Sequence, residues 1–208
     1  MSINHIKVSR TARYFTLGEL GDKTKSIWIV IHGYGELANG FIIQFEPLAN
    51  AGHFVVAPEA LNRFYWKGFG GKPVASWMTS EDRLNEIADY VNYLSELYGT
   101  LPQHLPLNVL GFSQGVATAS RWIAMKNVKC QKLVFCSGEI GRELIGEQEA
   151  IDHFNQQNIL FTSGNNDAFY SIEQVERLMQ AYKQTGLQFD FKLFEGVHEV
   201  NVDLLMDV

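Results

Sequence analysis

Short apolar, β-branched runs alternate along the chain with longer segments of helical periodicity, and this alternation constrains the fold most. A strand that is apolar at nearly every position must be buried on both faces, as strands are in parallel sheets covered by helices. Such strands alternating with helices are typical of an α/β domain. We therefore predict a mostly parallel central sheet with helices on both faces. The predicted strands are 26–31, 53–57, 107–111, 132–136, 159–163 and 189–194, with an antiparallel edge hairpin in 8–17.

The clearest helix is predicted over 81–98, where residues recur at the three- and four-residue steps of one helix face. This stripe consists of Leu84, Ile87, Ala88, Val91, Leu94, Ser95 and Tyr98. Gly99 is expected to end the helix, because glycine is a common C-terminal stop. Further helices are predicted over 41–51, 114–125 and 172–185. No repeat or linker divides the sequence, so we expect a single domain over residues 1–208.

Charge and composition narrow the classes of function. The formal net charge is −6 with only 17 Lys and Arg, which argues against nucleic acid as a partner, because binding a phosphate backbone needs a clustered cationic face. No long apolar run occurs and the first residues are polar and mixed, so we expect no signal peptide and no integral membrane association. Cys130 and Cys136 lie too far apart in one extended segment to bond, and reduced thiols suit a cytoplasmic protein. A homodimer is compatible with the sequence, which has no feature that decides the oligomeric state.

The join between the predicted strand 107–111 and the predicted helix 114–125 carries the pattern Gly-x-Ser-x-Gly, from Gly111 to Gly115. Between a strand and a helix, this pattern presents a serine nucleophile. The serine must occupy a strained turn, and its flanking glycines are needed because strand and helix pass too close for a β-carbon. We predict Ser113 as the nucleophile. The alternative, a chance match in a glycine-rich loop, is disfavoured by the strand before and the helix after.

Two backbone N–H groups are predicted to receive the oxyanion. The helix after the serine begins beneath the reacting carbonyl, so its unpaired N–H groups and dipole favour negative charge there, and Gln114 N–H is the first donor. The predicted strand 26–31 runs into the His-Gly-Tyr-Gly segment 32–35, which makes Tyr34 N–H the second donor. Each such donor is worth roughly 3 kcal/mol. We interpret His32, at the end of a buried strand, as hydrogen-bonded structure rather than as a base or metal ligand.

A serine hydroxyl needs a neutral imidazole to take its proton, and an acceptor must hold the other imidazole nitrogen. In this class of site the order along the chain is Ser, Asp or Glu, then His, each at the carboxyl end of a strand. Asp167 follows the predicted strand 159–163, and His198 follows the predicted strand 189–194. We predict His198 as the base and Asp167 as its orienting carboxylate. The competing interpretation of Asp167 is a turn residue or a cap for the helix that begins near Ser171.

The irregular segment 61–78 is rich in aromatic residues and glycines and reaches the predicted catalytic edge of the sheet. Such a segment can form an aromatic wall for an acyl or aryl group, so Trp66, Phe69 and Trp77 are predicted to contact substrate. The alternative is that these rings only cover the edge of the sheet. The cations of the segment, Arg63, Lys67 and Lys72, are interpreted as solvated, with binding of an anionic substrate as the alternative.

Taken together, these motifs resemble the phospholipase/carboxylesterase family of the α/β-hydrolase superfamily, which includes acyl-protein thioesterases and small bacterial carboxylesterases. The resemblance covers nearly the whole chain and rests on residues 32–35, 76–77 and 111–115, on Gly164 with Asp167, and on the late His198. It implies an α/β-hydrolase fold with a minimal cap or none. It also implies a carboxylesterase or phospholipase-type serine hydrolase that cleaves small-molecule esters or thioesters through an acyl-enzyme, without metal or cofactor.

Three residues depart from the pattern of that family. Val116, Ala168 and Val197 stand where glycine, proline and glycine are usual, and only ten residues follow His198, so the closing helix is expected to be short. These departures bear on efficiency more than on the assignment. They also motivate a second hypothesis, a non-catalytic ligand-binding protein on an α/β-hydrolase scaffold, which the fold alone does not exclude.

Overall fold

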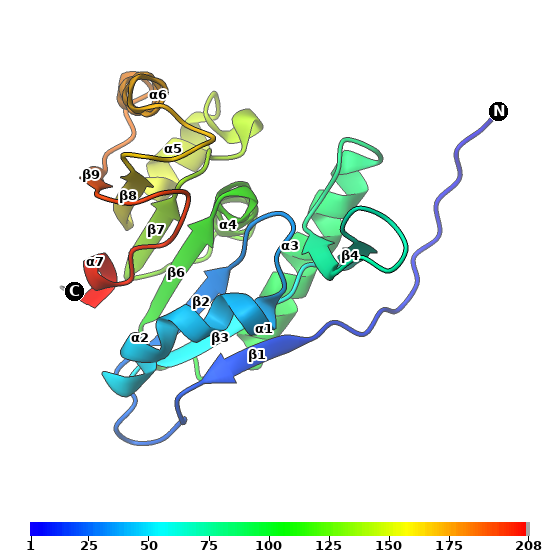
Figure 1. Ribbon diagram of the computed structural model, residues 1–208, viewed down its shortest axis with the longest axis horizontal. Helices are drawn as coiled ribbons and strands as arrows, with labels where there is room; N and C mark the ends of the chain where they lie inside the picture. The colour runs from blue at the N-terminus through cyan, green and yellow to red at the C-terminus, as the bar shows by residue number, and fades with distance from the viewer. Residues whose placement is uncertain (207–208) are drawn as a thin grey trace.

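A seven-stranded sheet forms the centre of the protein in the computed structural model, which describes residues 1–206 (Figure 1). The last two residues of the predicted domain, Asp207 and Val208, lie outside the described residues. The strand order is β1-β3-β2-β6-β7-β8-β9, with β1 antiparallel to β3 and the other neighbours parallel. The strands are β1 Tyr14–Leu17, β2 Ile27–Ile31, β3 Phe54–Pro58, β6 Leu107–Phe112, β7 Lys132–Cys136, β8 Asn158–Gly164 and β9 Asp190–Phe194. The predicted mostly parallel α/β architecture is confirmed.

The amino-terminal edge of the sheet differs from its prediction. The hairpin predicted in 8–17 is wrong, because β1 is a single strand that pairs with β3, and residues 1–13 form an extended arm (Figure 1). The segment contains no Gly, Pro, Asn or Asp with which to make a tight turn. Its ionic contacts reach other parts of the chain instead, as in the ion pair between Arg13 Nε and Glu59 Oε1 at 2.7 Å.

Helices occupy the predicted segments, with two differences. The predicted helix 41–51 is broken, because one helix ends at Phe41, a 3-10 turn follows, and a short helix begins at Glu46 with Pro47, which lacks a backbone N–H, in its first turn. In the long helix α3 the buried residues are Ile87, Tyr90, Val91, Leu94 and Leu97, whereas Leu84 in the first turn is 75% exposed. The helices are α1 Ala38–Phe41, α2 Glu46–Asn50, α3 Arg83–Gly99, α4 Gln114–Met125, α5 Gln148–Phe154, α6 Ile172–Gln184 and α7 Asp203–Met206, with 3-10 turns η1 Ile42–Phe45 and η2 Arg142–Leu144. None of the described helices combines the length and apolarity that crossing a membrane requires.

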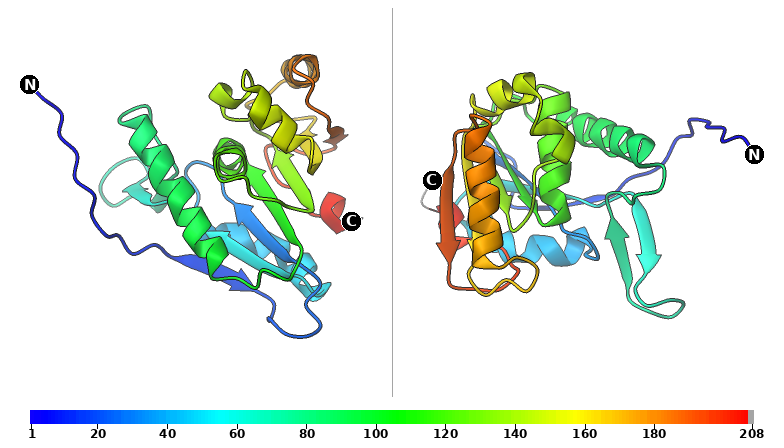
Figure 2. Two further views of the ribbon diagram at one scale, coloured as in Figure 1. Left: turned by 180° about the vertical axis from the view of Figure 1, so that it is seen from behind. Right: turned by 90° about the horizontal axis from the view of Figure 1, so that it is seen from above.

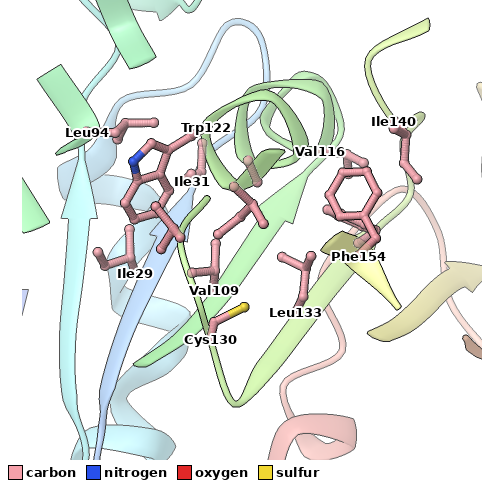
Figure 3. Close-up of a cluster of buried hydrophobic side chains, with 14 of the residues drawn as sticks. Ile29, Ile31, Leu94, Val109, Val116, Trp122, Cys130, Leu133, Ile140 and Phe154 are labelled. Carbon is pink, nitrogen blue, oxygen red and sulfur yellow. The ribbon is translucent and has the colours of Figure 1, made fainter. Parts of the chain in front are cut away.

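The sheet separates two apolar clusters, one on each face. In β2, Ile27, Ile29 and Ile31 belong to the cluster beneath α3 and α4, while Trp28 and Val30 belong to the cluster beneath α1 and α2. Figure 3 shows the first cluster, in which side chains from β2 and β6 lie beside the α4 ring of Trp122. Because both faces are covered, every residue of β2 is buried, as its unbroken apolar run requires.

The aromatic segment after β3 forms a second, two-stranded sheet that projects from the body of the protein (Figure 2). Its strands are β4 Asn62–Tyr65 and β5 Pro73–Ser76, which pair antiparallel. At its tip Lys67, Gly68 and Gly70 have positive φ angles of 62°, 94° and 84°, which glycine adopts without strain. The base of the hairpin is tied to the loop after β2, because Ala75 O accepts the Gly35 N–H at 2.9 Å.

Candidate active site

Ser113 lies in the turn between β6 and α4, with φ 52° and ψ −118°, a conformation that non-glycine residues rarely adopt. Its backbone N–H donates to Cys136 O at 2.9 Å, which holds the turn against β7. The side chain is half-buried, and its hydroxyl makes no hydrogen bond to any residue within 1–206. The strained serine turn predicted from the sequence is therefore present.

Glycine is required on both sides of this serine. A β-carbon on Gly111 would lie 2.4 Å from Gly115 O, and one on Gly115 would lie 2.2 Å from Ile31 O. Both distances are far below van der Waals contact, so α4 crosses the ends of β2 and β6 only because these side chains are absent. A third glycine, which sequence reasoning missed, acts in the same way, since a β-carbon on Gly138 would lie 2.4 Å from Ser113 O.

Asp167 and His198 meet at the same edge of the sheet. The His198 Nδ1–H donates to Asp167 Oδ2 at 2.7 Å, and the Asp167 side chain is fully buried. The other oxygen, Oδ1, accepts the backbone N–H of Phe169 at 2.8 Å and that of Tyr170 at 3.3 Å. Asp167 thus both orients the imidazole and closes the turn, so the two interpretations of this residue hold together. Nε2 is the imidazole nitrogen left for the serine.

The loops that carry these two residues are bound to each other. Asn165 N–H donates to Phe194 O at 2.9 Å, which joins the loop after β8 to the end of β9. A β-carbon on Gly164 would lie 2.2 Å from Val197 O, so the histidine loop can pass here only over a glycine. Val197 itself is 54% exposed and leaves the contact between His198 and Asp167 intact. The closing helix α7 is short, as expected.

The two predicted oxyanion donors belong to segments that adjoin the serine: Gln114 directly follows it, and Tyr34 follows Gly33, on which a β-carbon would lie 3.2 Å from Ser113 Cβ. Within residues 1–206, neither Tyr34 N–H nor Gln114 N–H donates a hydrogen bond, so both are available to a ligand. The Gln114 side chain fixes the start of α4, because its Oε1 accepts the Trp77 N–H at 3.0 Å and its Nε2 donates to Met78 O at 2.9 Å. Gln114 therefore has a structural side chain and a free backbone N–H at a helix N-terminus.

His32 is a structural residue, which confirms its interpretation from the sequence. Its Nδ1 lies 2.7 Å from Gly33 O and its Nε2 accepts the Ala60 N–H at 3.1 Å, so the ring donates through Nδ1 and is neutral. Burial lowers the pKa of His32 to about 4. The Trp77 indole donates to His32 O at 2.9 Å. These bonds fix the loop that carries Tyr34.

The three residues predicted to contact substrate do not form one wall. Trp66 is 41% exposed and its ring packs on Tyr34 with centroids 5.8 Å apart, beside the loop of residues 32–35 that carries this predicted oxyanion donor (the oxyanion loop). Phe69 is fully exposed at the tip of the β4–β5 hairpin. Trp77 is only 1% exposed and lies in the core beneath His32, so the expectation of a substrate surface on Trp77 is corrected to a structural role.

Sequence reasoning missed two residues beside the imidazole or the serine. The Phe169 ring lies 4.6 Å from the His198 ring between centroids and is 72% exposed. Glu36 Oε2 accepts the Gly33 N–H at 2.7 Å. The signal for both was their position, since Glu36 directly follows the His-Gly-Tyr-Gly segment and Phe169 lies two residues after Asp167.

The cysteines lie apart from this chemistry. Cys130 and Cys136 are both free and buried, which confirms that they are not bonded to each other, and burial raises the pKa of each thiol to about 12. Among residues 1–206, no group of three or more His, Cys, Asp and Glu side chains is arranged to hold a metal ion.

A strained serine between a strand and a helix, with a hydrogen-bonded Asp–His pair at the same sheet edge, defines the α/β-hydrolase class of protein. A family model described as serine hydrolase (FSH1) matches residues 31–201, and the chain belongs to this family. A search of curated proteins found no significant match.

Solved structures show the same fold. Acyl-protein thioesterase 2 from Zea mays superimposes with a TM-score of 0.71 at 20% identity, covering 95% of this chain and 96% of that one. Esterase PE8 gives 0.67 at 18% identity with 95% and 96% coverage. A phospholipase/carboxylesterase from Dyadobacter fermentans gives 0.60 at 18% identity with 96% and 95% coverage. The predicted α/β-hydrolase fold and the family resemblance are thereby confirmed.

Proposed function

We propose that this serine hydrolase cleaves carboxylic esters or thioesters through Ser113, His198 and Asp167. The observation that carries the proposal is the 2.7 Å hydrogen bond from His198 Nδ1 to Asp167 Oδ2, at the sheet edge where the strained Ser113 turn lies. Asp167 fixes the tautomer that leaves Nε2 unprotonated and able to accept the serine proton.

In the acylation step, Ser113 Oγ attacks the carbonyl carbon of the substrate while His198 Nε2 takes the hydroxyl proton. The Ser113 hydroxyl must first come into hydrogen-bond reach of Nε2, as catalytic groups often do only when substrate binds. Negative charge then develops on the carbonyl oxygen, where the free N–H groups of Tyr34 and Gln114 stabilise it. The intermediate collapses, the bond to the alcohol or thiol breaks, and the imidazolium protonates the leaving group.

Deacylation repeats these steps with water in place of the serine. His198 Nε2 takes a proton from the water, and the hydroxide adds to the acyl carbon. The tetrahedral intermediate then collapses, the bond from Ser113 Oγ to the acyl carbon breaks, and the imidazolium returns its proton to Oγ as the carboxylic acid leaves. Asp167 stays ionised throughout and stabilises the transient imidazolium.

The surface near the imidazole and the oxyanion loop carries exposed aromatic rings, which favour a substrate with an apolar acyl or aryl group. Tyr34 is 50% exposed, Trp66 is 41% exposed and Phe169 is 72% exposed, and large exposed rings near a reactive group provide apolar contact area. The names of the similar structures include a thioesterase, an esterase and a phospholipase/carboxylesterase, so we propose oxygen esters and thioesters alike.

The test is labelling and turnover in a matched pair of serine variants. The wild type and a Ser9→Ala control, altered in the exposed arm, should be labelled by a fluorophosphonate and hydrolyse p-nitrophenyl acetate. Ser113→Ala should lose labelling and about ten-thousandfold or more in kcat, with an unchanged melting temperature. A folded Ser113→Ala protein with wild-type turnover refutes the proposal. Tight binding of esters by a wild type that turns over none of them would support the ligand-binding hypothesis instead.

A further inference from the structure

Glu36 is an acidic residue next to the nucleophile that the reaction above does not use. Its backbone is held on the β4–β5 hairpin, because Glu36 O accepts the Ala75 N–H at 3.0 Å. Its carboxylate is held on the oxyanion loop, because Oε2 accepts the Gly33 N–H at 2.7 Å. The residue is half-buried. With both ends fixed, the position of its charge is fixed as well.

The carboxylate lies across Gly33 from the serine. A β-carbon built on Gly33 would be 3.0 Å from Glu36 Oε2, 3.2 Å from Ser113 Cβ and 3.2 Å from Phe112 Cδ1. The Phe112 ring in turn packs on the His198 ring, with centroids 4.9 Å apart. Because Gly33 has no side chain, nothing from that residue fills the space between the carboxylate and the serine side chain. Glu36 therefore belongs to the surroundings of the reacting carbonyl.

The charge of Glu36 has no cationic partner at short range. Among residues 1–206, the ion pairs within 4.0 Å do not include Glu36. Burial raises the pKa of this carboxyl, while the hydrogen bond from Gly33 N–H and the charge of protonated His198 act in the opposite direction. A partly desolvated, unpaired carboxylate acts more strongly on a nearby charge than one in bulk water.

We propose, resting on the proposed ester hydrolysis, that Glu36 determines specificity by charge. Its carboxylate disfavours esters whose acyl chain brings a negative charge near Ser113, so the site takes neutral or cationic esters. The oxyanion that forms during attack is common to every ester, so the effect of Glu36 on it cancels in a comparison of two substrates. A negative charge on the acyl chain, a few ångströms from the Glu36 carboxylate, lowers kcat/KM for that ester by about tenfold.

The experiment compares p-nitrophenyl pentanoate with p-nitrophenyl hemiglutarate, whose acyl chains have the same length, after subtraction of the rate without enzyme. Glu36→Gln keeps an oxygen acceptor for Gly33 N–H and removes the charge. Glu96→Gln, exposed in the last turn of α3, changes the net charge by the same amount at the opposite edge of the sheet, since α3 leads into the start of β6 and Ser113 follows the end of β6. This control separates a local effect of Glu36 from the field of a chain with net charge −6.

The kcat/KM ratio of pentanoate to hemiglutarate should fall about tenfold in Glu36→Gln and stay at the wild-type value in Glu96→Gln. Glu36→Asn, a shorter neutral side chain, should shift the ratio in the same direction, so a folding failure of one variant leaves the test standing. A wild-type ratio in the folded Glu36 variants overturns the proposed charge selection and leaves the proposed ester hydrolysis standing. Failure of the wild type to hydrolyse either ester or to be labelled at Ser113 overturns the proposed function and charge selection together.

Discussion

Replacement of Asp167 by asparagine isolates the orienting role of this residue from its structural role. The Asp167 carboxylate accepts three hydrogen bonds, from His198 Nδ1 at 2.7 Å, Phe169 N at 2.8 Å and Tyr170 N at 3.3 Å. Asparagine has one oxygen and one NH₂ group. If that oxygen keeps the two backbone N–H groups, the NH₂ faces His198 Nδ1.

The imidazole must then accept a hydrogen bond at Nδ1 and carry its proton on Nε2, the nitrogen that has to receive the serine proton. Loss of the productive tautomer costs about ten-thousandfold in kcat, or about 5 kcal/mol of transition-state stabilisation. The stability cost should be much smaller, about 1 kcal/mol, because both backbone N–H groups keep an acceptor and the size of the side chain is unchanged.

The assay measures kcat with p-nitrophenyl acetate beside urea unfolding for Asp167→Asn, with Asp167→Ala as the companion variant. Asp167→Ala removes the acceptor for Phe169 N–H and Tyr170 N–H as well, and should lose roughly 1–3 kcal/mol more stability than Asp167→Asn. A folded Asp167→Asn protein with kcat within tenfold of the wild type would refute the role of Asp167 in orienting His198. Equal losses of stability in the two variants would refute the capping role.

Two further predictions concern the fold around the site. Gly115→Ala should destabilise the protein by about 3 kcal/mol or more in urea unfolding, because its β-carbon would lie 2.2 Å from Ile31 O, whereas Gly146→Ala, with open space around it, should change stability by less than about 1 kcal/mol; equal effects would contradict the close approach. Burial lowers the pKa of His32 to about 4 from an ordinary 6.5, so the unfolded chain binds this proton first as pH falls, and folding stability should decline by about 3 kcal/mol between pH 6.5 and 4. His32→Gln should show a smaller decline over this range, and an unchanged decline would mean that other groups cause it.

Much of the catalytic edge could be predicted because its signals are local. A buried strand ends where its apolar run ends, and parallel strands place their carboxyl ends together. The positions of Ser113, Asp167 and His198 after three such strands therefore predicted that they share one edge, and the structure places them there. Catalysis by these residues stays a prediction until the variants above are measured.

What could not be predicted depends on contacts between distant segments. The aromatic residues of 61–78 look alike in the sequence, but Trp77 is packed beneath His32 while Phe69 is exposed at a hairpin tip. The sequence of the hairpin does not alternate between apolar and polar residues, so no strand was predicted there. Its base is held by pairing between Ala75 and Glu36, which are far apart along the chain. Glu36 stands next to the His-Gly-Tyr-Gly segment in the sequence, but its position beside the serine turn depends on its pairing with Ala75 and its bond to Gly33 N–H, which the sequence does not show.

The site is built mainly from backbone that passes close to backbone. Glycines at 111, 115, 138 and 164 are each required because a β-carbon would lie within 2.4 Å of a carbonyl oxygen. The groups proposed to hold the oxyanion are also backbone N–H groups, which every residue except proline supplies. Such a framework makes few demands on side chains, which agrees with the occurrence of the same fold in structures with 20% identity or less. Glu36 and Phe169 lie beside this framework, and we propose that such neighbouring residues decide which ester is accepted.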